Sequence, residues 1–288
     1  MHLLIDGKNL LYRGIYASLN TATADHFVAI SRMMHSYLHK FGYGNVHVFW
    51  DDKKENLWRR EILQNYKDSE CRDKPSEVEE KLIRYQEICE DTWKHMNIKQ
   101  YKKSRMEADD LIFAFCHLIH DETVIVSNDG DMTQISYRYD HVKIYNPLQK
   151  IVCNRPSIDP VLMKCLDGDK SDNIHGYYGI GPKKATKCIE NTKMLWELIS
   201  RDNASVYITN RKLIDLSLCP YLNDNMIYIM EYYNQPIKFD KKLIIELLYS
   251  KHKVKGIMAE FKSLISPFMM IGENNGSTCR IHTSNDGS

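Results

Sequence analysis

Short apolar runs alternate with amphipathic segments along the first half of the chain. A short apolar run predicts a buried strand, and apolar residues spaced three or four positions apart predict a helix. Strands are expected at 2–6, 46–50 and 123–127, with a further pair at 139–145 and 150–153. Helices are expected after the first strand and at 25–41, 56–67, 77–96 and 107–119. Strands separated by helices indicate an α/β fold, with a parallel-rich sheet flanked by helices.

Composition divides the chain into three parts. A sheet-bearing domain is expected over 1–155, a mainly helical part over 156–268 and a disordered tail, rich in Asn, Gly, Ser and Thr, over 269–288. The eight cysteines form no C-x-x-C pair, which argues against a zinc site or a disulfide framework and indicates a reducing compartment. The chain shows neither a signal peptide nor a long apolar run, so we expect a cytoplasmic protein without a membrane partner.

Acidic residues stand at the ends of three predicted strands, namely Asp6, Asp51 and Asp129. Ligands of open α/β sheets bind outside the carboxyl ends of the strands, so these side chains are expected to converge. Further acids lie in short motifs at Glu107, Asp109, Asp110, Asp131, Asp169 and Asp172. On a helix, Glu107 and Asp110 share a face.

A cluster of these nine acids requires cations. Two like charges about 4 Å apart, at an effective dielectric of about 20, repel by roughly 4 kcal/mol. Oxygen ligands favour hard divalent ions, so we expect two Mg²⁺ ions, for which Mn²⁺ substitutes. Such a pair would polarise a phosphodiester and generate hydroxide. For any single acid the alternative is a helix cap or a solvated charge. An EF-hand calcium loop has a Glu at its twelfth position. With Asp129 as the first position the twelfth is Asp140, so such a loop is not indicated.

A glycine-rich loop follows the last two acids and leads into Pro182, a favoured first residue of a helix. Its backbone N–H groups can approach an anion closely, and the helix N-terminus favours negative charge. The residues expected to hold phosphate here are Gly179, Gly181, Lys183, Lys184 and Lys187. The alternatives are a plain helix–loop–helix and lysines on solvated helix faces.

Net charge conceals an asymmetry between the acids and the rest of the chain. The whole chain carries +1, but without the nine acids it has 39 basic and 29 acidic residues, a net charge of +10. Besides the loop, the basic residues include Lys53, Lys54, Arg59, Arg60 and Lys67. A basic surface around an acidic, metal-demanding pocket suits a polyanion that is both held and cut.

Five ordered motifs resemble those of the 5′-nuclease family, the 5′→3′ exonucleases and flap endonucleases of DNA replication, and most closely its short bacteriophage members. They are Ile5-Asp-Gly-Lys-Asn-Leu10, Phe49-Trp-Asp51, Glu107-Ala-Asp-Asp110, Ser127-Asn-Asp-Gly-Asp131 and Gly168-Asp-Lys-Ser-Asp-Asn-Ile174. In addition, Gly179-Ile-Gly-Pro-Lys-Lys-Ala185 resembles the family's helix–three-turn–helix, which grips duplex phosphates around a monovalent cation. The resemblance spans about residues 1–265.

The resemblance implies a PIN-like nuclease domain over 1–155 that hydrolyses DNA at 5′ flaps, 5′ overhangs or nicks. It implies a monomer, Mg²⁺-dependent chemistry and K⁺ at the helix–three-turn–helix. Lys67 stands where the family places a basic residue that positions the scissile phosphate, and Arg13 is expected to assist it.

A helical arch within about 67–100, admitting a single-stranded 5′ end, is also implied. In this hypothesis the apolar stripe of 77–96 packs against the helix expected at 56–67. The alternative for 77–96 is a helix packed on the flank of the domain.

Two other functions are compatible with the same residues. An RNA-primer-removing nuclease of the RNase H type would use the same fold on RNA–DNA hybrids, and sequence barely separates the two. A non-catalytic fork-DNA binder is disfavoured, because a binder would gain from losing the negative charge of the nine acids. The tail lacks a Q-x-x-[IL]-x-x-F-F box, so no sliding-clamp partner is indicated.

Overall fold

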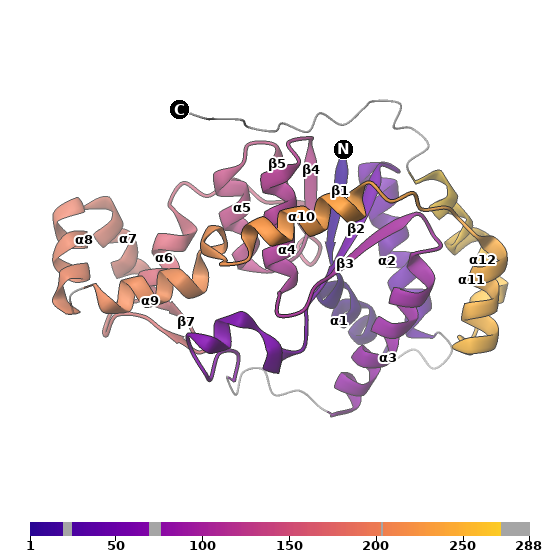
Figure 1. Ribbon diagram of the computed structural model, residues 1–288, viewed down its shortest axis with the longest axis horizontal. Coiled ribbons are helices and arrows are strands. Elements are labelled where there is room, and N and C mark those ends of the chain that lie inside the picture. The colour runs from indigo at the N-terminus through magenta and orange to yellow at the C-terminus, as the bar shows by residue number, and fades with distance from the viewer. Residues whose placement is uncertain (20–24, 69–75, 203, 272–288) are drawn as a thin grey trace.

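A six-stranded sheet forms the centre of the protein (Figure 1). The structure, a computed structural model, describes residues 1–19, 25–68, 76–202 and 204–271, and its main sheet has the strand order β3-β2-β1-β4-β5-β6. The strands are β1 His2–Asp6, β2 Asn45–Trp50, β3 Ile98–Lys102, β4 Thr123–Val126, β5 Val142–Asn146 and β6 Ile151–Val152. Neighbours from β3 to β5 pair in parallel, and β6 pairs antiparallel with β5. The expected parallel-rich α/β sheet is therefore confirmed.

Strand β1 lies in the middle of the sheet, and all of its residues are buried, as in a strand covered on both faces. Its side chains alternate between the two faces, because Leu3 and Ile5 join one core and Leu4 joins the other. Ile5 pairs in register with Val48 and Val126. The carboxyl ends of β1, β2 and β4 therefore meet at one edge of the sheet.

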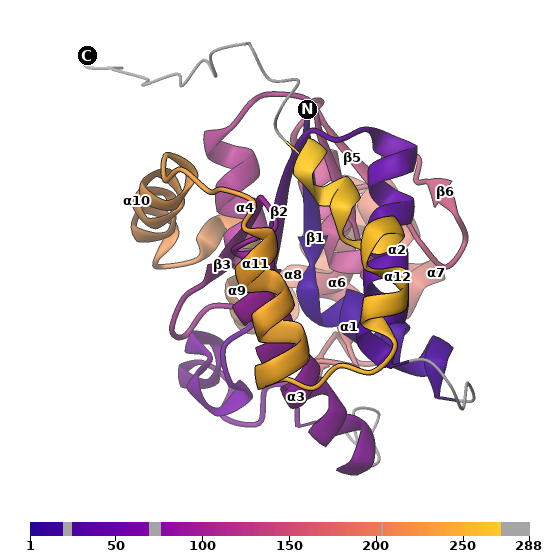
Figure 2. The same cartoon turned by 90° about the vertical axis from the view of Figure 1, so that its right-hand side faces the viewer.

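Helices from both ends of the chain cover the first face (Figure 2). They are α1 Gly7–Ser18, α2 His26–Phe41, α3 Ser76–Trp93, α11 Lys241–Ile245 and α12 Ile257–Leu264. Ile244, Phe261 and Phe268 are buried in the same core as Leu3 and Ile5. The segment 241–271 thus packs on the N-terminal domain, although it follows the helical part in sequence.

The second face is covered by α4 Ala108–Leu118 and α10 Leu222–Tyr233, which pack against each other. Leu111 and Phe115 of α4 share this core with Ile229 of α10 and Leu4 of β1. The short α5 Thr133–Arg138 lies beside β5.

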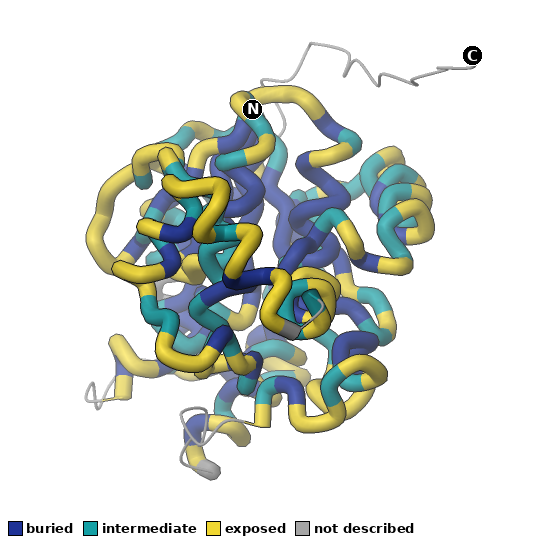
Figure 3. The backbone as a smooth tube through the Cα atoms, turned by 90° about the vertical axis from the view of Figure 1, so that its left-hand side faces the viewer, coloured by how far each residue is buried: buried dark blue, intermediate teal, exposed yellow. Residues whose placement is uncertain are grey.

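A small helical lobe lies at one end of the molecule, on the left of Figure 1 and facing the viewer in Figure 3. It contains α6 Pro160–Asp167, α7 Pro182–Glu190, α8 Thr192–Ile199 and α9 Ser205–Ile214, with a ribbon of β7 Gly168–Asp169 and β8 Ile174–His175. Short helical turns connect the elements: η1 Lys54–Asn56, η2 Trp58–Glu61, η4 Gly130–Met132, η5 Ser200–Asp202, η6 Leu216–Leu218, η7 Glu246–Lys251 and η8 Ser266–Met270.

Two expectations for the region between β2 and α4 were wrong. The helix expected at 56–67 is replaced by the 3₁₀ turns η1 and η2, and β3 was not expected at all. The expected pairing of 56–67 with the stripe of 77–96 is also wrong. Leu57 packs in a core with Val161 and Leu213, whereas Leu82 and Ile88 of α3 belong to the core on the first face of the sheet. Helix α3 therefore lies on the flank of the domain.

Parts of two expectations fall outside the described residues. These parts are residues 69–75 of the expected arch and residues 272–288 of the expected tail. Residues 269–270, which were also expected in the tail, form the end of the turn η8, and Ile271 follows this turn. In the described part of the chain, no helix combines the length and the apolarity needed to cross a membrane.

Candidate active site

Three carboxylates at the strand ends converge, as the sequence predicts. Asp6 ends β1 and caps α1 by accepting the N–H of Asn9 at 3.0 Å. Asp51, which follows β2, accepts the N–H of Ala108 at 2.9 Å and thereby connects β2 to the start of α4. Asp129, which follows β4, caps η4. Asp6 lies close enough to Asp51 and Asp129 for both charges to raise its pKa.

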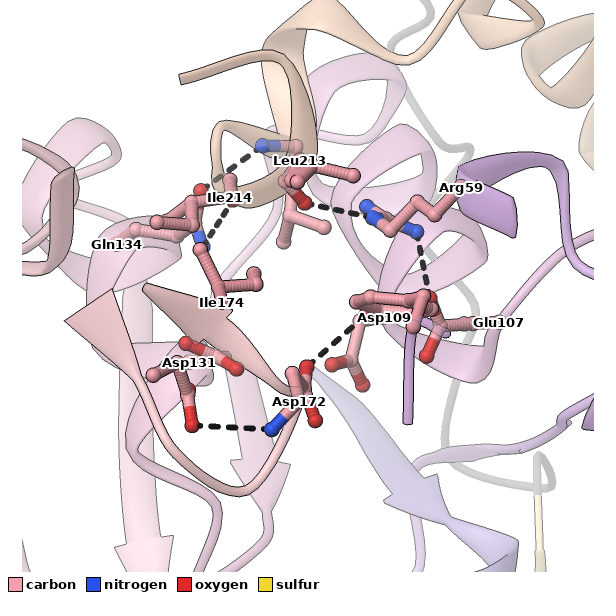
Figure 4. A pocket seen from close by; sticks show the side chains of 12 residues that line it. Arg59, Glu107, Asp109, Asp131, Gln134, Asp172, Ile174, Leu213 and Ile214 are labelled. Carbon is pink, nitrogen blue, oxygen red and sulfur yellow. Dashed lines mark hydrogen bonds and ion pairs between the residues drawn. The ribbon is translucent and has the colours of Figure 1, made fainter. Parts of the chain in front are cut away.

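The first turn of α4 contributes carboxylates in two different environments. Glu107 and Asp110 form a capping box, and the Glu107 N–H donates to Asp110 Oδ2 at 3.1 Å. Asp110 is 1% exposed, and its oxygens also accept from Arg59 at 2.8 and 2.9 Å and from Trp58 Nε1 at 3.1 Å. Asp109 instead points toward the acids of the pocket (Figure 4). The structure thus brings Asp109 to the cluster, whereas Asp110 is held by Arg59 and Trp58.

Two groups of acids have oxygens close enough to hold one ion each. One contains Asp109, Asp129 and Asp131, and the other contains Asp131, Asp169 and Asp172, with ligand atoms within 4.8 Å of one another in each group. Asp131 belongs to both. Asp169 and Asp172 of the second group come from β7 and the turn before β8, so the helical lobe meets the sheet edge at Asp131 of η4 (Figure 4).

Burial and mutual repulsion oppose ionisation of part of this cluster. Burial, followed by the charges of Asp51 and Asp129, raises the pKa of Asp6 to about 7. Burial and the neighbouring acids raise the pKa of Asp109 well above its usual range, and burial also raises the pKa of Asp131. Burial also raises the pKa of Glu107, but the positive charges of Lys67 and Arg59 outweigh this effect and hold its pKa below the usual range. Cations are therefore what allows these acids to ionise together.

Three lysines already contact the acids. Lys8 Nζ lies 3.1 Å from Asp51 Oδ2, Lys67 pairs with Glu107, and Lys164 pairs with Asp131 and with Asp169. The structure thus places the Lys67 ammonium among the acids. Its backbone has a φ of +62° and its N–H donates to the Asp172 carbonyl at 3.1 Å, which fixes the residue beside the second acid group.

Arg13 is directed elsewhere. Its guanidinium donates to Tyr37 Oη and, at 3.5 Å, to the carbonyl oxygen of Pro147. These contacts hold Arg13 against α2 and the turn after β5, so the structure does not bring it to the acids as expected.

The glycine loop has the backbone form that the sequence predicts. Gly179 has a φ of +72°, Gly181 caps α7, and Pro182 is its first residue. Lys183, Lys184 and Lys187 are exposed on α7, and Lys184 Nζ also donates to the carbonyl of Gly179 at 2.8 Å. All three lysines are thus accessible, and Lys184 also closes the loop.

Three residues of the site have a role that the sequence analysis missed. Arg59 was expected on a basic surface but is 2% exposed, and its Nε donates to the Leu213 carbonyl at 2.7 Å. Tyr66 Oη lies 3.1 Å from Glu107 Oε2 and 2.9 Å from Asp172 Oδ2, so its single O–H can donate to either carboxylate and connects the two ends of the pocket. Lys164 carried no signal beyond its position five residues before Asp169.

Comparison with known proteins agrees with this arrangement. Residues 1–161 match the family described as "5'-3' exonuclease, N-terminal resolvase-like domain". A 5'-3' exonuclease of Halalkalibacterium halodurans is 31% identical over 213 residues, which cover 65% of this chain and 69% of the relative. Flap endonuclease Xni of Shewanella baltica is 28% identical over 212 residues, covering 69% and 77% of the two chains.

Among solved structures, the bacteriophage T5 D15 flap endonuclease in a complex with DNA and metal ions has a similar fold. Its TM-score is 0.62 at 19% identity, with 86% of this chain and 97% of that chain covered. This likeness supports the PIN-like α/β fold. Because the family match spans more than half of the sequence, the chain belongs to the 5′–3′ exonuclease family, and it is a 5′ nuclease.

Proposed function

We propose that this chain hydrolyses DNA phosphodiesters at 5′ flaps and free 5′ ends in DNA replication, as a monomer that uses two Mg²⁺ ions. The observation that carries the proposal is the pair of acid groups that share Asp131 at the edge of the sheet. A carboxylate that belongs to both groups would place two ions next to each other, as required when two ions act on one phosphate.

The residues present fit hard divalent ions, since each group offers carboxylate oxygens. The contacts of Lys8, Lys67 and Lys164 with the acids are a further sign that this edge attracts positive charge. When bound, the ions supply Lewis acidity and lower the pKa of a bound water.

The acids would divide into ion holders and supports. Asp109, Asp129 and Asp131 would hold one ion, and Asp131, Asp169 and Asp172 the other. Asp6, Asp51 and Glu107 would complete the first site from the strand ends and the start of α4. Asp110 would serve as the anchor of Arg59 rather than as a ligand, because it is buried against Arg59 and Trp58 and, unlike Glu107, is not among the residues that line the pocket.

Lys67 would orient the scissile phosphate. Its ammonium lies among Glu107, Asp51 and Asp172, whose charges raise its pKa against the effect of burial, so it stays protonated. A fixed cation beside the ions stabilises negative charge that develops on the phosphate. Arg13 has no part in this step, because its guanidinium contacts Tyr37 and Pro147.

The loop at Gly179 and Gly181 and the lysines of α7 would hold the duplex beside the cut, with K⁺ as a further ligand of the loop. Exposed Lys183 and Lys187 supply charge, and the N–H groups at the start of α7 favour phosphate. These contacts would carry no base information, as expected for an enzyme that reads structure rather than sequence.

The test is a Mg²⁺ assay with labelled 5′-flap, nicked and RNA–DNA hybrid oligonucleotides. We expect cleavage of the DNA flap that EDTA abolishes and Mn²⁺ restores. Preferential cleavage of the hybrid would instead indicate a primer-removing nuclease. Binding of all three substrates without any Mg²⁺-dependent cleavage would contradict the proposal and indicate a fork binder.

A further inference from the structure

The Lys164 ammonium lies between two acids that come from different parts of the fold. Its Nζ is 2.6 Å from Asp169 Oδ2 and also contacts Asp131 Oδ1. Lys164 and Asp169 belong to α6 and β7, whereas Asp131 belongs to η4 beside the main sheet. One ammonium therefore connects the helical lobe to the sheet edge.

We propose that Lys164 is a positioning residue that acts as an internal counter-cation for the second acid group. It would balance Asp131 and Asp169 before a divalent ion binds, and it would give up these carboxylates when the ion arrives. The inference rests on the proposed function, since it assigns a competitor to the ion held by Asp131, Asp169 and Asp172.

Competition follows from the shared atoms. The carboxylates that Lys164 contacts are two of the three in the second acid group. A lysine ammonium and a divalent ion would repel each other at such short range. If both contacted the same carboxylates, this repulsion would reduce the binding free energy of the ion. Lys164 should thus weaken binding of the second ion while stabilising the ion-free protein.

Space beside Lys164 allows the side chain to move away. A cavity of about 190 Å³ adjoins it, lined by Gly130, Gln134, Pro160, Met163 and Ile214 together with Asp131 and Lys164 itself. Its walls are mainly apolar, which suits the methylene stem of a lysine whose ammonium turns toward water. The cavity therefore offers room for the Lys164 side chain to leave the two acids.

The first measurement is calorimetric titration of Ca²⁺ and Mn²⁺ into the DNA-free protein. Lys164→Met keeps the methylene stem and removes the charge. This variant should bind the ion at Asp131, Asp169 and Asp172 at least about tenfold more tightly than the wild type does. Lys164→Arg keeps the charge and should stay near the wild type. Lys143→Met is the matched control, because Lys143 pairs with Glu122 at 2.9 Å on an exposed surface away from the acids. Equal or weaker ion binding by Lys164→Met would overturn the proposal.

The second measurement uses only the wild-type protein and decides the matter if Lys164→Met does not fold. Acetylation of individual lysines is followed by mass spectrometry without and with Ca²⁺. We expect the ion to increase modification of Lys164 several-fold and to leave Lys143 unchanged. If the protein takes up Ca²⁺ but the reactivity of Lys164 is constant, the counter-cation role is wrong and the proposed function stands. If the protein takes up no divalent ion, the proposed function itself fails.

Discussion

The guanidinium of Arg59 donates from Nη2 to Oδ1 of Asp110 at 2.8 Å, and both side chains are almost completely buried. The same guanidinium donates to Glu107 Oε2 at 2.7 Å, and Asp110 accepts the N–H of Glu107. Arg59 therefore fixes the turn that presents Glu107 and Asp109 to the other acids. It is a structural requirement of the site that need not touch the substrate.

Replacing Arg59 with Met should destabilise the protein by about 3–5 kcal/mol, because it leaves the Asp110 carboxylate buried without its partner. Urea unfolding of the two proteins measures the difference. Arg60→Met is the control, since Arg60 pairs with Asp68 at 2.9 Å on the surface and should cost about 1 kcal/mol or less. If both variants lost the same free energy of unfolding, the buried Arg59–Asp110 pair would contribute no more to stability than the surface Arg60–Asp68 pair.

Arg59 also illustrates what the sequence could not predict. Strong patterns gave β1, β2, β4 and the acids that follow them, because short apolar runs and strand-end carboxylates depend on local sequence. Whether an arginine next to Trp58 lies on the surface or in the core depends on partners 48–154 residues away. No local pattern contains that information.

Strand β3 and the turns before it were missed for a related reason. β3 is an edge strand with the sequence Ile98-Lys-Gln-Tyr-Lys102, in which Ile98 and Tyr101 are buried and break the usual alternation. Residues 56–67 have apolar positions at helical spacing, but Leu57, between the 3₁₀ turns η1 and η2, and Tyr66, in the turn that follows them, pack against the helical lobe. Tertiary contacts decide the backbone at both places.

Lys183→Ala combined with Lys184→Ala should weaken binding of duplex DNA similarly for every sequence. If both lysines contact phosphate, the slope of log K against log salt should become shallower by roughly 2. Lys143→Ala, on a surface away from the acids, should leave the slope unchanged. A double variant with the wild-type slope would mean that the duplex is held elsewhere.

The stability contributed by a buried histidine pair should be lost as pH decreases from about 6.5 toward 4. His2 Nδ1 and His47 Nε2 are 3.1 Å apart, and burial lowers the pKa of His2 to about 4. A lowered folded-state pKa means that the neutral form is favoured on folding, so this contribution is present above pH 6.5 and is lost in acid. For His2 it amounts to roughly 3 kcal/mol.

The variant His2→Gln isolates this effect from that of Asp6, whose raised pKa of about 7 acts in the opposite direction. The free energy of unfolding should decrease less steeply between pH 6.5 and 4 in His2→Gln than in the wild type. Parallel pH curves for the two proteins would exclude His2 as the source.

Passage of a single strand with a free 5′ end is a prediction for the region beside Lys67. Streptavidin placed on a 5′-terminal biotin before the enzyme is added should suppress flap cleavage, because a threaded path excludes a bulky end. Streptavidin added after the enzyme has bound should suppress cleavage much less. Equal cleavage of blocked and free flaps would rule out threading.

The most direct measurement is single-turnover cleavage of a 5′-flap DNA by Asp131→Asn beside the wild type, at saturating enzyme and Mg²⁺. Asp131 is the carboxylate common to both acid groups, so losing its charge should impair both ions. We predict a decrease of several orders of magnitude in the cleavage rate, with DNA binding unchanged or tighter because one negative charge is removed near phosphate. A rate within about tenfold of the wild type, a loss of less than about 1.4 kcal/mol in transition-state stabilisation, would contradict the two-ion site.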